Sequence, residues 1–130
     1  MEEEVSPSES VARFITQKGY YRPSDQTVKH NAFMPNRQGK TSVYRVIDLD
    51  DEEIFEIGRR FVADELKKPL MGRADILVSK ILDRELMVEL DPTPHPRHAN
   101  IVDWPEDESK HRLIALELAG EAELHLISPG

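Results

Sequence analysis

Residues 40–66, KTSVYRVIDLDDEEIFEIGRRFVADEL, decide the fold because they place a strand directly before a helix. The first part, 40–47, is dominated by β-branched and aromatic residues, which favour strands. Val43 and Arg45 alternate with Tyr44, the period-two pattern of a strand whose two sides meet different surroundings. A strand followed by an amphipathic helix predicts a domain in which helices cover a sheet.

The helix is predicted over 51–66 and carries signals at both ends. Asp50 suits the N-cap position, and Glu53 three residues later completes a capping box. Acidic residues fill the first turn, where the helix dipole favours negative charge. Pro69 ends the helix, because proline cannot continue the backbone hydrogen bonding.

A second main helix is predicted over 105–119. Pro105 suits its first turn, and Gly120 suits its C-terminal cap. The residues expected on its core side are Leu113, Ile114, Leu116 and Leu118. The other expected elements are a short apolar element at 11–16, strands at 70–77, 86–90 and 121–128, and a short helix or turn at 79–86.

These elements predict an α+β fold, in which a mixed or antiparallel sheet of short strands is packed by the two main helices. The chain of 130 residues is long enough for one such domain, expected over 10–130. Residues 1–9 are expected to form a disordered acidic tail. Residues 19–39 are rich in turn formers and predict a long irregular segment.

The composition excludes several classes of function. The absence of cysteine excludes disulfides, thiolate metal sites and cysteine nucleophiles. A formal net charge of -8, with no basic cluster longer than two residues, argues against a nucleic-acid partner. No apolar run is long enough to span a membrane, and the acidic N-terminus lacks the pattern of a secretory signal. A cytoplasmic protein is therefore expected.

The candidate site lies in residues 91–105, DPTPHPRHANIVDWP. Each proline fixes its own φ and pushes the preceding residue towards extended geometry, so this stretch is expected to be a stiff, extended loop. Such a loop presents His95 and His98 with little loss of entropy. Trp104, the only tryptophan, is expected to be largely buried and to anchor the loop to the second helix.

The two histidines allow three interpretations. They could chelate zinc if His30, Asp91 or Asp103 supplied a third ligand. They could instead be hydrogen-bonded loop residues, which is the favoured interpretation, or they could face a ligand. Without thiolates or a helical frame for the ligands, the sequence predicts no metal and no cofactor.

Arg45 and Arg73 each lie in an otherwise apolar strand. Each arginine either extends its charged end to the surface or acts as a clamp for an anion. If both arginines converged with His98, the site would suit a carboxylate or phosphate group. The candidate ligand-binding residues are Arg45, Arg73, His95, His98 and Trp104.

VYRV at 43–46 and GEAELHLISPG at 120–130 together resemble the ADP-ribosyltransferase pattern. In that family an arginine on an early strand binds the nicotinamide dinucleotide, and an ExE motif on a late strand supplies the catalytic glutamate. The resemblance implies these roles for Arg45 and for Glu121 with Glu123. An ordinary glutamate-rich strand start explains the same residues.

Three further segments, HNAFMP, TSVYRV and PHPRHANIVDWPED, resemble a set of small uncharacterised bacterial proteins that share an AF-P, SV-R and HA-I skeleton. The resemblance covers roughly residues 30–120. It implies a bacterial cytoplasmic origin and carries no assigned activity. It also implies that Phe33, Arg45, His98 and Trp104 belong to one structural unit.

The sequence therefore favours a non-enzymatic binding or accessory module that acts on a partner protein through the 91–105 loop. The alternative is a small enzyme with Arg45, His98 and Glu123 around an anionic or nucleotide substrate. Geometry separates the two, because the enzyme requires Arg45 and His98 in one concave pocket.

Overall fold

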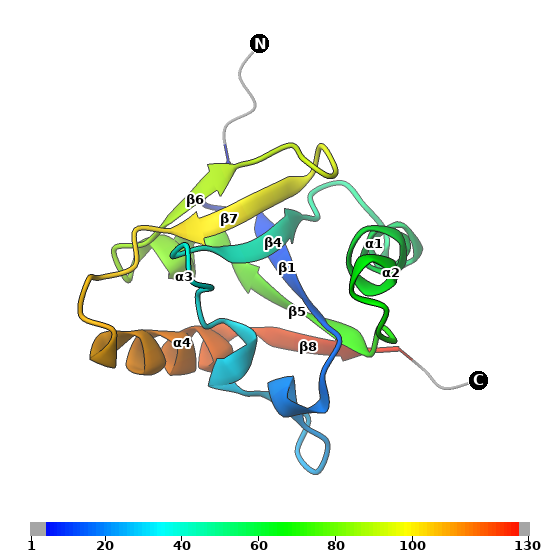
Figure 1. Cartoon of the computed structure of the whole chain (residues 1–130). Helices are drawn as coiled ribbons and strands as arrows, with labels where there is room; N and C mark the ends of the chain where they lie inside the picture. The colour runs from blue at the N-terminus through cyan, green and yellow to red at the C-terminus, as the bar shows by residue number, and fades with distance from the viewer. Residues whose placement is uncertain (1–4, 128–130) are drawn as a thin grey trace.

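The computed structural model describes residues 5–127, which form an antiparallel six-stranded sheet and three helical segments of more than three residues (Figure 1). The strands follow the order β6-β7-β4-β1-β5-β8, so β1 and β4 lie at the centre. This architecture confirms the predicted α+β fold. The strands are β1 (Ser10–Ile15), β4 (Thr41–Arg45), β5 (Gly72–Leu77), β6 (Met87–Leu90), β7 (His98–Val102) and β8 (Glu123–Leu126).

The first helical layer is continuous and has three parts, α1 (Asp51–Gly58), a π-helical turn η3 (Arg59–Ala63) and α2 (Asp64–Leu66). The other helices are α3 (Val78–Leu82) and α4 (Ser109–Glu121). Between β1 and β4 lie η1 (Lys18–Tyr20), a small hairpin of β2 (Tyr21–Arg22) and β3 (Thr27–Val28), and η2 (His30–Ala32). Within residues 5–127, no helix is long and apolar enough to cross a membrane.

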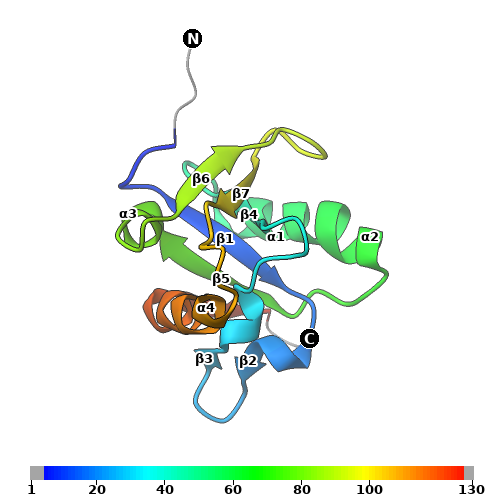
Figure 2. The same cartoon turned by 60° about the vertical axis from the view of Figure 1, so that its left-hand side comes forward.

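Figure 2 shows the sheet passing between α4 on one side and α1 with α2 on the other. We call these sides the α4 face and the α1 face. Side chains alternate between the faces along each strand, and the strand register aligns the alternation across the sheet. Val11, Val43 and Ile76 therefore share the α4 face, whereas Ala12, Tyr44 and Asp75 share the α1 face.

The α4 face carries one continuous apolar core. Ala115, Leu118 and Ala119 of α4 pack there against buried residues of the central strands, and η2 closes one end with Phe33 just beyond it. Apart from Thr41, the largest fully buried side chains among residues 5–127 belong to this core. They are Phe33, Ile15, Ile76, Ile81, Leu86, Ile101, Leu118, Val11, Val43 and Val78.

The α1 face carries a much smaller core. Phe14 and Tyr44 meet at 5.5 Å between ring centroids and are covered by Ile54 and Ile57 of α1. The helix comes so close to the sheet at Gly58 that a Cβ atom there would lie 2.6 Å from the Phe14 ring. The glycine is therefore required by contact with the sheet.

The predicted 51–66 helix is confirmed with its cap. The Asp50 carboxylate accepts a hydrogen bond from the Glu53 backbone N–H at 2.8 Å. The Glu53 side chain accepts one in return from the Asp50 backbone at 3.1 Å, which completes the capping box.

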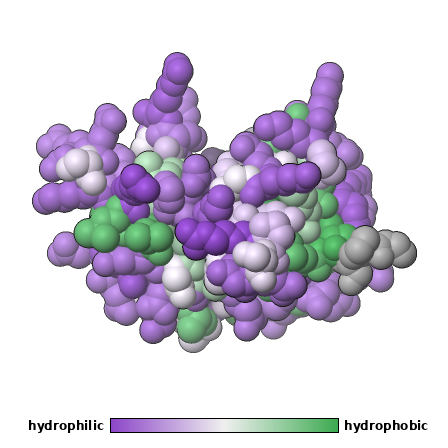
Figure 3. Space-filling view, turned by 90° about the horizontal axis from the view of Figure 1, so that it is seen from below, coloured by the Kyte–Doolittle hydropathy of each residue, from purple (hydrophilic) through white to green (hydrophobic). Residues whose placement is uncertain are grey.

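The predicted second helix begins about one turn later than expected, and a different side of it faces the core. It runs over Ser109–Glu121 instead of 105–119, and Gly120 lies inside it. Leu113 and Leu116 are 60% and 52% exposed, so two of the four predicted core residues face solvent. Small alanines replace them in the core, because Ala115 and Ala119 allow α4 to lie close to the sheet. Figure 3 views the side where α4 lies and shows separate apolar areas on a mostly hydrophilic surface.

The predicted stiff, extended loop over 91–105 is wrong in both halves, because the first half is a turn and most of the second half is a strand. Residues 91–97 turn the chain back from β6 to β7, and His98–Val102 form the second strand of that hairpin. The backbone N–H of His98 donates to the His95 carbonyl at 2.9 Å, which closes the turn. Proline fixes φ but is equally compatible with turns, so the proline spacing alone did not require an extended chain.

Two predictions at the edges of the domain also change. Residues 5–9 of the predicted tail belong to the fold, because Val5 packs on the core and the Glu9 side chain is buried; residues 1–4 lie outside the described part. Trp104 is only partly buried. Its indole N–H donates to the Ile101 carbonyl at 3.2 Å, and its ring meets His111 edge-on.

Candidate functional site

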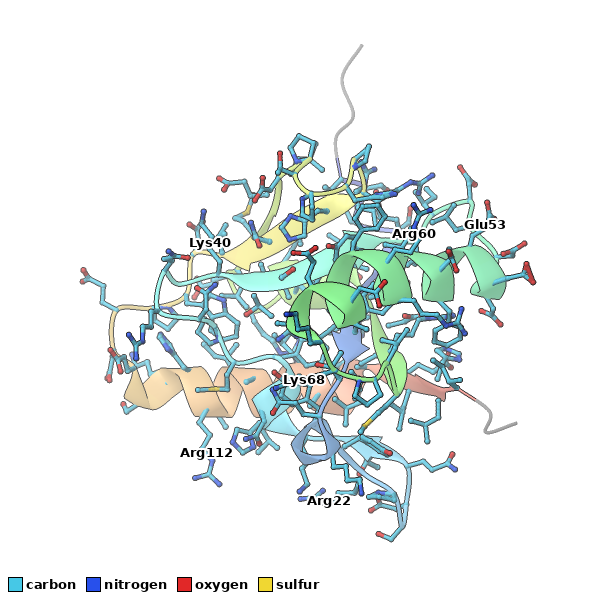
Figure 4. All side chains as sticks on the ribbon, turned by 45° about the vertical axis from the view of Figure 1, so that its right-hand side comes forward. Arg22, Lys40, Glu53, Arg60, Lys68 and Arg112 are labelled. Carbon is cyan, nitrogen blue, oxygen red and sulfur yellow. The ribbon has the colours of Figure 1, made fainter. Side chains whose placement is uncertain are left out.

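A cavity of about 420 Å³ opens on the α1 face beside the covered centre of the sheet. Its floor is formed by Ser42 and Tyr44 of β4 and by His98 of β7, which all lie on this face. The wall towards the helices is apolar, and the opposite rim is polar. The remaining lining residues are Arg13, Gln17, Tyr20, Phe61, Val62, Glu65, Leu66, Lys68 and Pro94. Figure 4 shows Lys68 just beyond the end of α2.

The cavity forms where two central strands separate. β1 pairs with β4 at only two positions, Val11 with Arg45 and Ala12 with Tyr44. Beyond them the Arg13 side chain takes over the pairing, because its guanidinium donates to the Ser42 carbonyl at 3.0 Å and to the Ala32 carbonyl at 2.6 Å. A charged side chain thus satisfies backbone groups that a neighbouring strand would otherwise satisfy.

Ser42 and His98 form the polar centre of the floor. The Ser42 Oγ atom lies 2.7 Å from His98 Nε2. On the other side of the ring, Nδ1 lies 2.9 Å from the Asp91 carbonyl oxygen, which can only accept a hydrogen bond. Nδ1 therefore carries the proton, and in neutral His98 the Nε2 atom accepts from the Ser42 hydroxyl. The favoured interpretation of His98 as hydrogen-bonded agrees with this geometry.

The Asp91 side chain adds a negative charge behind the ring. Its Oδ2 atom lies 3.6 Å from His98 Nδ1 and accepts a hydrogen bond from the Asn100 amide at 3.2 Å. Asn100 is buried on the same face of β7. The His98 imidazole thus lies in space between the Ser42 hydroxyl and the Asp91 carboxylate.

Tyr44 supplies the aromatic part of the floor. Its ring centroid lies 5.1 Å from that of His98. Burial raises the pKa of Tyr44 to about 12, with a further contribution from the charge of Asp91, so the phenol stays protonated. Its hydroxyl has no hydrogen-bond partner among residues 5–127 and is therefore a free donor.

The π-helical turn brings Phe61 and Val62 to the cavity wall. Such turns insert an extra residue and change which side chains face the sheet, and they are frequent at functional sites. Phe61 meets the ring of His95 at 4.8 Å, edge-on. The 91–97 turn is thus held against the helical layer, with Pro94 lining the cavity between them.

His95 stands at the edge of this contact as a neutral ring. Its Nδ1 atom accepts from the Arg97 backbone N–H at 3.0 Å, which leaves the proton on Nε2. Burial and then the charge of Arg97 lower the pKa of His95 below its ordinary value. His95 and His98 both lie close to Tyr44, so the structure brings these two predicted site residues together.

Arg45 lies on the α4 face, away from His98. Its Nε donates to Glu9 Oε1 at 2.8 Å and its second guanidinium nitrogen donates to Oε2 at 2.9 Å, in a buried bidentate pair. Burial acts to raise the pKa of Glu9, but the hydrogen bonds from Arg45 and the Ser6 N–H outweigh it, and the pKa is lowered. The arginine therefore holds the N-terminal segment, and it neither reaches the surface freely nor faces the cavity.

Arg73 is also engaged internally. It donates to Asp75 at 3.0 Å and to Asp51 of α1 at 2.7 Å, and its guanidinium lies 4.7 Å from the Phe55 ring centroid. Burial raises the pKa of Asp75, and the charge and hydrogen bond of Arg73 offset this only in part. The structure thus uses Arg73 to attach α1 to the sheet, and neither Arg73 nor Arg45 joins His98 in the cavity as the predicted anion site would require.

The residues of the ADP-ribosyltransferase resemblance do not come together. Glu123 lies on the α1 face of β8, the opposite face from Arg45, with β1 and β5 between the two strands. Glu123 contacts His125 at 2.9 Å, and Glu121 contacts Arg84 at 3.4 Å.

The sequence reasoning missed most of the cavity. Ser42 is not among the predicted site residues, although its two-residue spacing from Tyr44 in a strand places both side chains on one face. Arg13, Phe61 and Leu66 carry no local sequence signal, because an apolar or charged residue that lines a cavity has the same sequence pattern as one that lies in a core or an ion pair.

Over residues 5–127, no group of three or more histidine or acidic side chains is arranged to hold a metal ion. Trp104 does not line the cavity.

Comparisons with family models, with curated proteins and with solved structures gave no match to this chain. The site is therefore interpreted from its own geometry.

Proposed function

We propose that the protein is a binding module that receives an apolar or aromatic side chain of a partner protein in the cavity between Pro94 and Leu66. The observation that carries the proposal is the composition of this cavity. The 91–97 turn contributes Pro94 to it, α2 contributes Leu66, and the floor is aromatic and polar. A volume of about 420 Å³ with an apolar wall and a few polar groups is typical of sites for small ligands or anchoring side chains.

The rim supports a protein partner over a nucleic acid. Glu65 offsets one of the two cationic lining residues, Arg13 and Lys68, and the whole chain has a net charge of -8, which disfavours a nucleic-acid partner. Leu66 is 53% exposed at the rim, where a partner would cover it. A buried aromatic or aliphatic anchor surrounded by a polar rim is the usual arrangement of a strong contact in a protein interface.

The test is selection of peptides from a random display library on the folded protein, followed by calorimetry with the enriched peptides. We expect the peptides to share one large apolar residue. Leu66→Asp should weaken their binding by about tenfold or more, since it places a charge in a desolvated contact. Leu116→Asp is the matched control, because Leu116 on α4 is as exposed as Leu66, at 52%.

Enriched peptides that bind Leu66→Asp as tightly as wild type would place the binding surface elsewhere. A library that yields no peptide above background on wild type would contradict the proposal altogether.

A further inference from the structure

We propose that Ser42 is a nucleophile and that His98 is its general base, in an esterase-type site for small apolar acyl groups. The inference uses the same cavity and rests on its being open to ligands, as the binding proposal requires. A hydrogen-bonded serine and histidine, with the histidine oriented by a third group, is the arrangement that activates a hydroxyl for acyl transfer.

The tautomer of His98 carries the inference. The Asp91 carbonyl holds the proton on Nδ1, at 2.9 Å, so the lone pair of Nε2 points at the Ser42 hydroxyl, at 2.7 Å. A histidine held the other way round would donate to Ser42 and could not deprotonate it. The Asp91 carboxylate, 3.6 Å from Nδ1, stabilises the imidazolium that forms when the proton arrives.

Access to the hydroxyl is the second requirement. Ser42 lines the cavity and is partly exposed, whereas His98 behind it is 8% exposed. A substrate can therefore reach the nucleophile while the base stays shielded. The Arg13 guanidinium fixes the Ser42 backbone through its carbonyl, at 3.0 Å, which keeps the hydroxyl in place.

The cavity walls define the substrate class. Phe61, Val62 and Leu66 form an apolar wall for the acyl chain. We assign the stabilisation of developing negative charge to two donors among the lining residues, the Tyr44 phenol, which stays protonated and has no hydrogen-bond partner among the described residues, and the Lys68 cation. We therefore expect esters or thioesters of short to medium acyl groups.

The reaction balances with water as the only co-substrate. Ser42 Oγ bonds to the acyl carbon while its proton passes to His98 Nε2. The carbon–oxygen or carbon–sulfur bond to the leaving group then breaks, and the leaving group takes the proton from Nε2. Water, deprotonated by Nε2, attacks the acyl-serine, releases the carboxylic acid and restores the Ser42 hydroxyl.

The first experiment is labelling of the folded protein with an alkyl fluorophosphonate, read by intact mass and peptide mapping. We expect one adduct per chain on Ser42, none in Ser42→Ala, and labelling about 100-fold slower in His98→Asn, the usual contribution of a general base. Ser24→Ala, at an exposed turn serine, should label like wild type. Hydrolysis of p-nitrophenyl butyrate should follow the same order. No adduct on wild type, or an adduct on another residue only, overturns the inference.

A second variant guards against misfolding. The chain has no cysteine, so Ser42→Cys introduces a single thiol. Beside His98, it should react with iodoacetamide at pH 6.5 about tenfold or more faster than the thiol of Ser24→Cys, because a neighbouring histidine favours the thiolate. Adding His98→Asn to Ser42→Cys should remove the difference. Equal rates for Ser42→Cys and Ser24→Cys overturn the inference.

The two proposals fail separately. If enriched peptides bind wild type and Ser42→Ala alike while no reagent labels Ser42, the cavity binds but does not react. If neither peptides nor reagents use the cavity, both proposals fall.

Discussion

The two faces of the sheet are made by the same strands and differ in what covers them. On the α4 face, the helix residues Leu118 and Ala115 close a continuous apolar core. On the α1 face, the buried apolar cluster is the smaller one around Phe14 and Tyr44. The ion pairs of Arg73 and the Ser42–His98 hydrogen bond lie beside it on the same face. Stability therefore comes mainly from the α4 face, and the groups able to do chemistry collect on the α1 face.

The difference follows from how each helical layer approaches the sheet. α4 packs on the sheet side of the main core through the small residues Ala115 and Ala119, whereas the α1 layer makes its closest approach to the sheet at Gly58. Beyond that contact, the π-helical turn and the separation of β1 from β4 leave room for the cavity. The candidate site thus lies on the part of the sheet that the hydrophobic core does not cover.

On the α4 face, the largest loss of stability is expected from removing the buried ion pair between Glu9 and Arg45. Glu9→Gln should lower the free energy of unfolding by about 3 to 5 kcal/mol, because it leaves the Arg45 charge buried without its carboxylate. Urea unfolding at neutral pH measures the loss. A variant as stable as wild type would show that the N-terminal segment is not held by this pair.

The same pair predicts an acid-side loss of stability. The folded pKa of Glu9 lies below its ordinary value of 4.5, so its contribution is fully present above that value and is lost as the pH falls through the folded pKa. The stability gap between wild type and Glu9→Gln should therefore shrink as the pH falls below 4.5. Urea midpoints at several pH values from 7 down to about 3 check it. A gap that stays constant over this range would rule out Glu9 as the titrating group.

Within the apolar core, Leu118→Ala should cost about 3 kcal/mol, as expected for a fully buried leucine. Leu113→Ala on the same helix is the matched control, and it should change stability by less than about 0.5 kcal/mol because Leu113 faces solvent. Thermal and urea unfolding compare the pair. Equal losses would mean that α4 is turned about its axis relative to the structure described here.

At the rim of the α4 face, Trp104→Ala should cost about 2 kcal/mol, less than the roughly 3 to 5 kcal/mol of a fully enclosed tryptophan. Trp104→Phe keeps most of the ring packing and loses the hydrogen bond to Ile101, so it should cost about 1 kcal/mol. Urea unfolding of both variants measures these losses. A loss above about 4 kcal/mol for Trp104→Ala would restore the fully buried anchor that the sequence predicts.

The smallest expected effect probes the α1 face. Gly58→Ala should cost about 1 to 2 kcal/mol, because the added Cβ atom displaces the Phe14 ring and lifts α1 from the sheet. Gly120→Ala, with no atom within 4 Å of the added group, should be neutral or stabilising by up to about 1 kcal/mol. Urea unfolding ranks them. If both variants gain stability, the close approach of α1 to the sheet is incorrect.

Local signals in the sequence were enough for much of the fold. The capping box of Asp50 and Glu53 acts within four residues, so it placed the start of α1 correctly. The alternation and β-branching of residues 40–47 placed β4 for the same reason. Local signals gave a wrong prediction where one residue type occurs in two kinds of position. Gly120 is predicted to cap the second helix, but it lies inside α4.

The sequence by itself determined where most strands and helices lie and that the chain builds an α+β fold, because propensity, periodicity and capping act over a few residues. Only the tertiary structure decided on which face of the sheet each strand side chain lies, and what it meets there. Arg45 and Tyr44 are neighbours in sequence, yet one meets Glu9 and the other lines the cavity. Ser42 and His98 are 56 residues apart and meet because β4 pairs with β7 in one register. Register depends on contacts between distant segments, so no local pattern could reveal that pair.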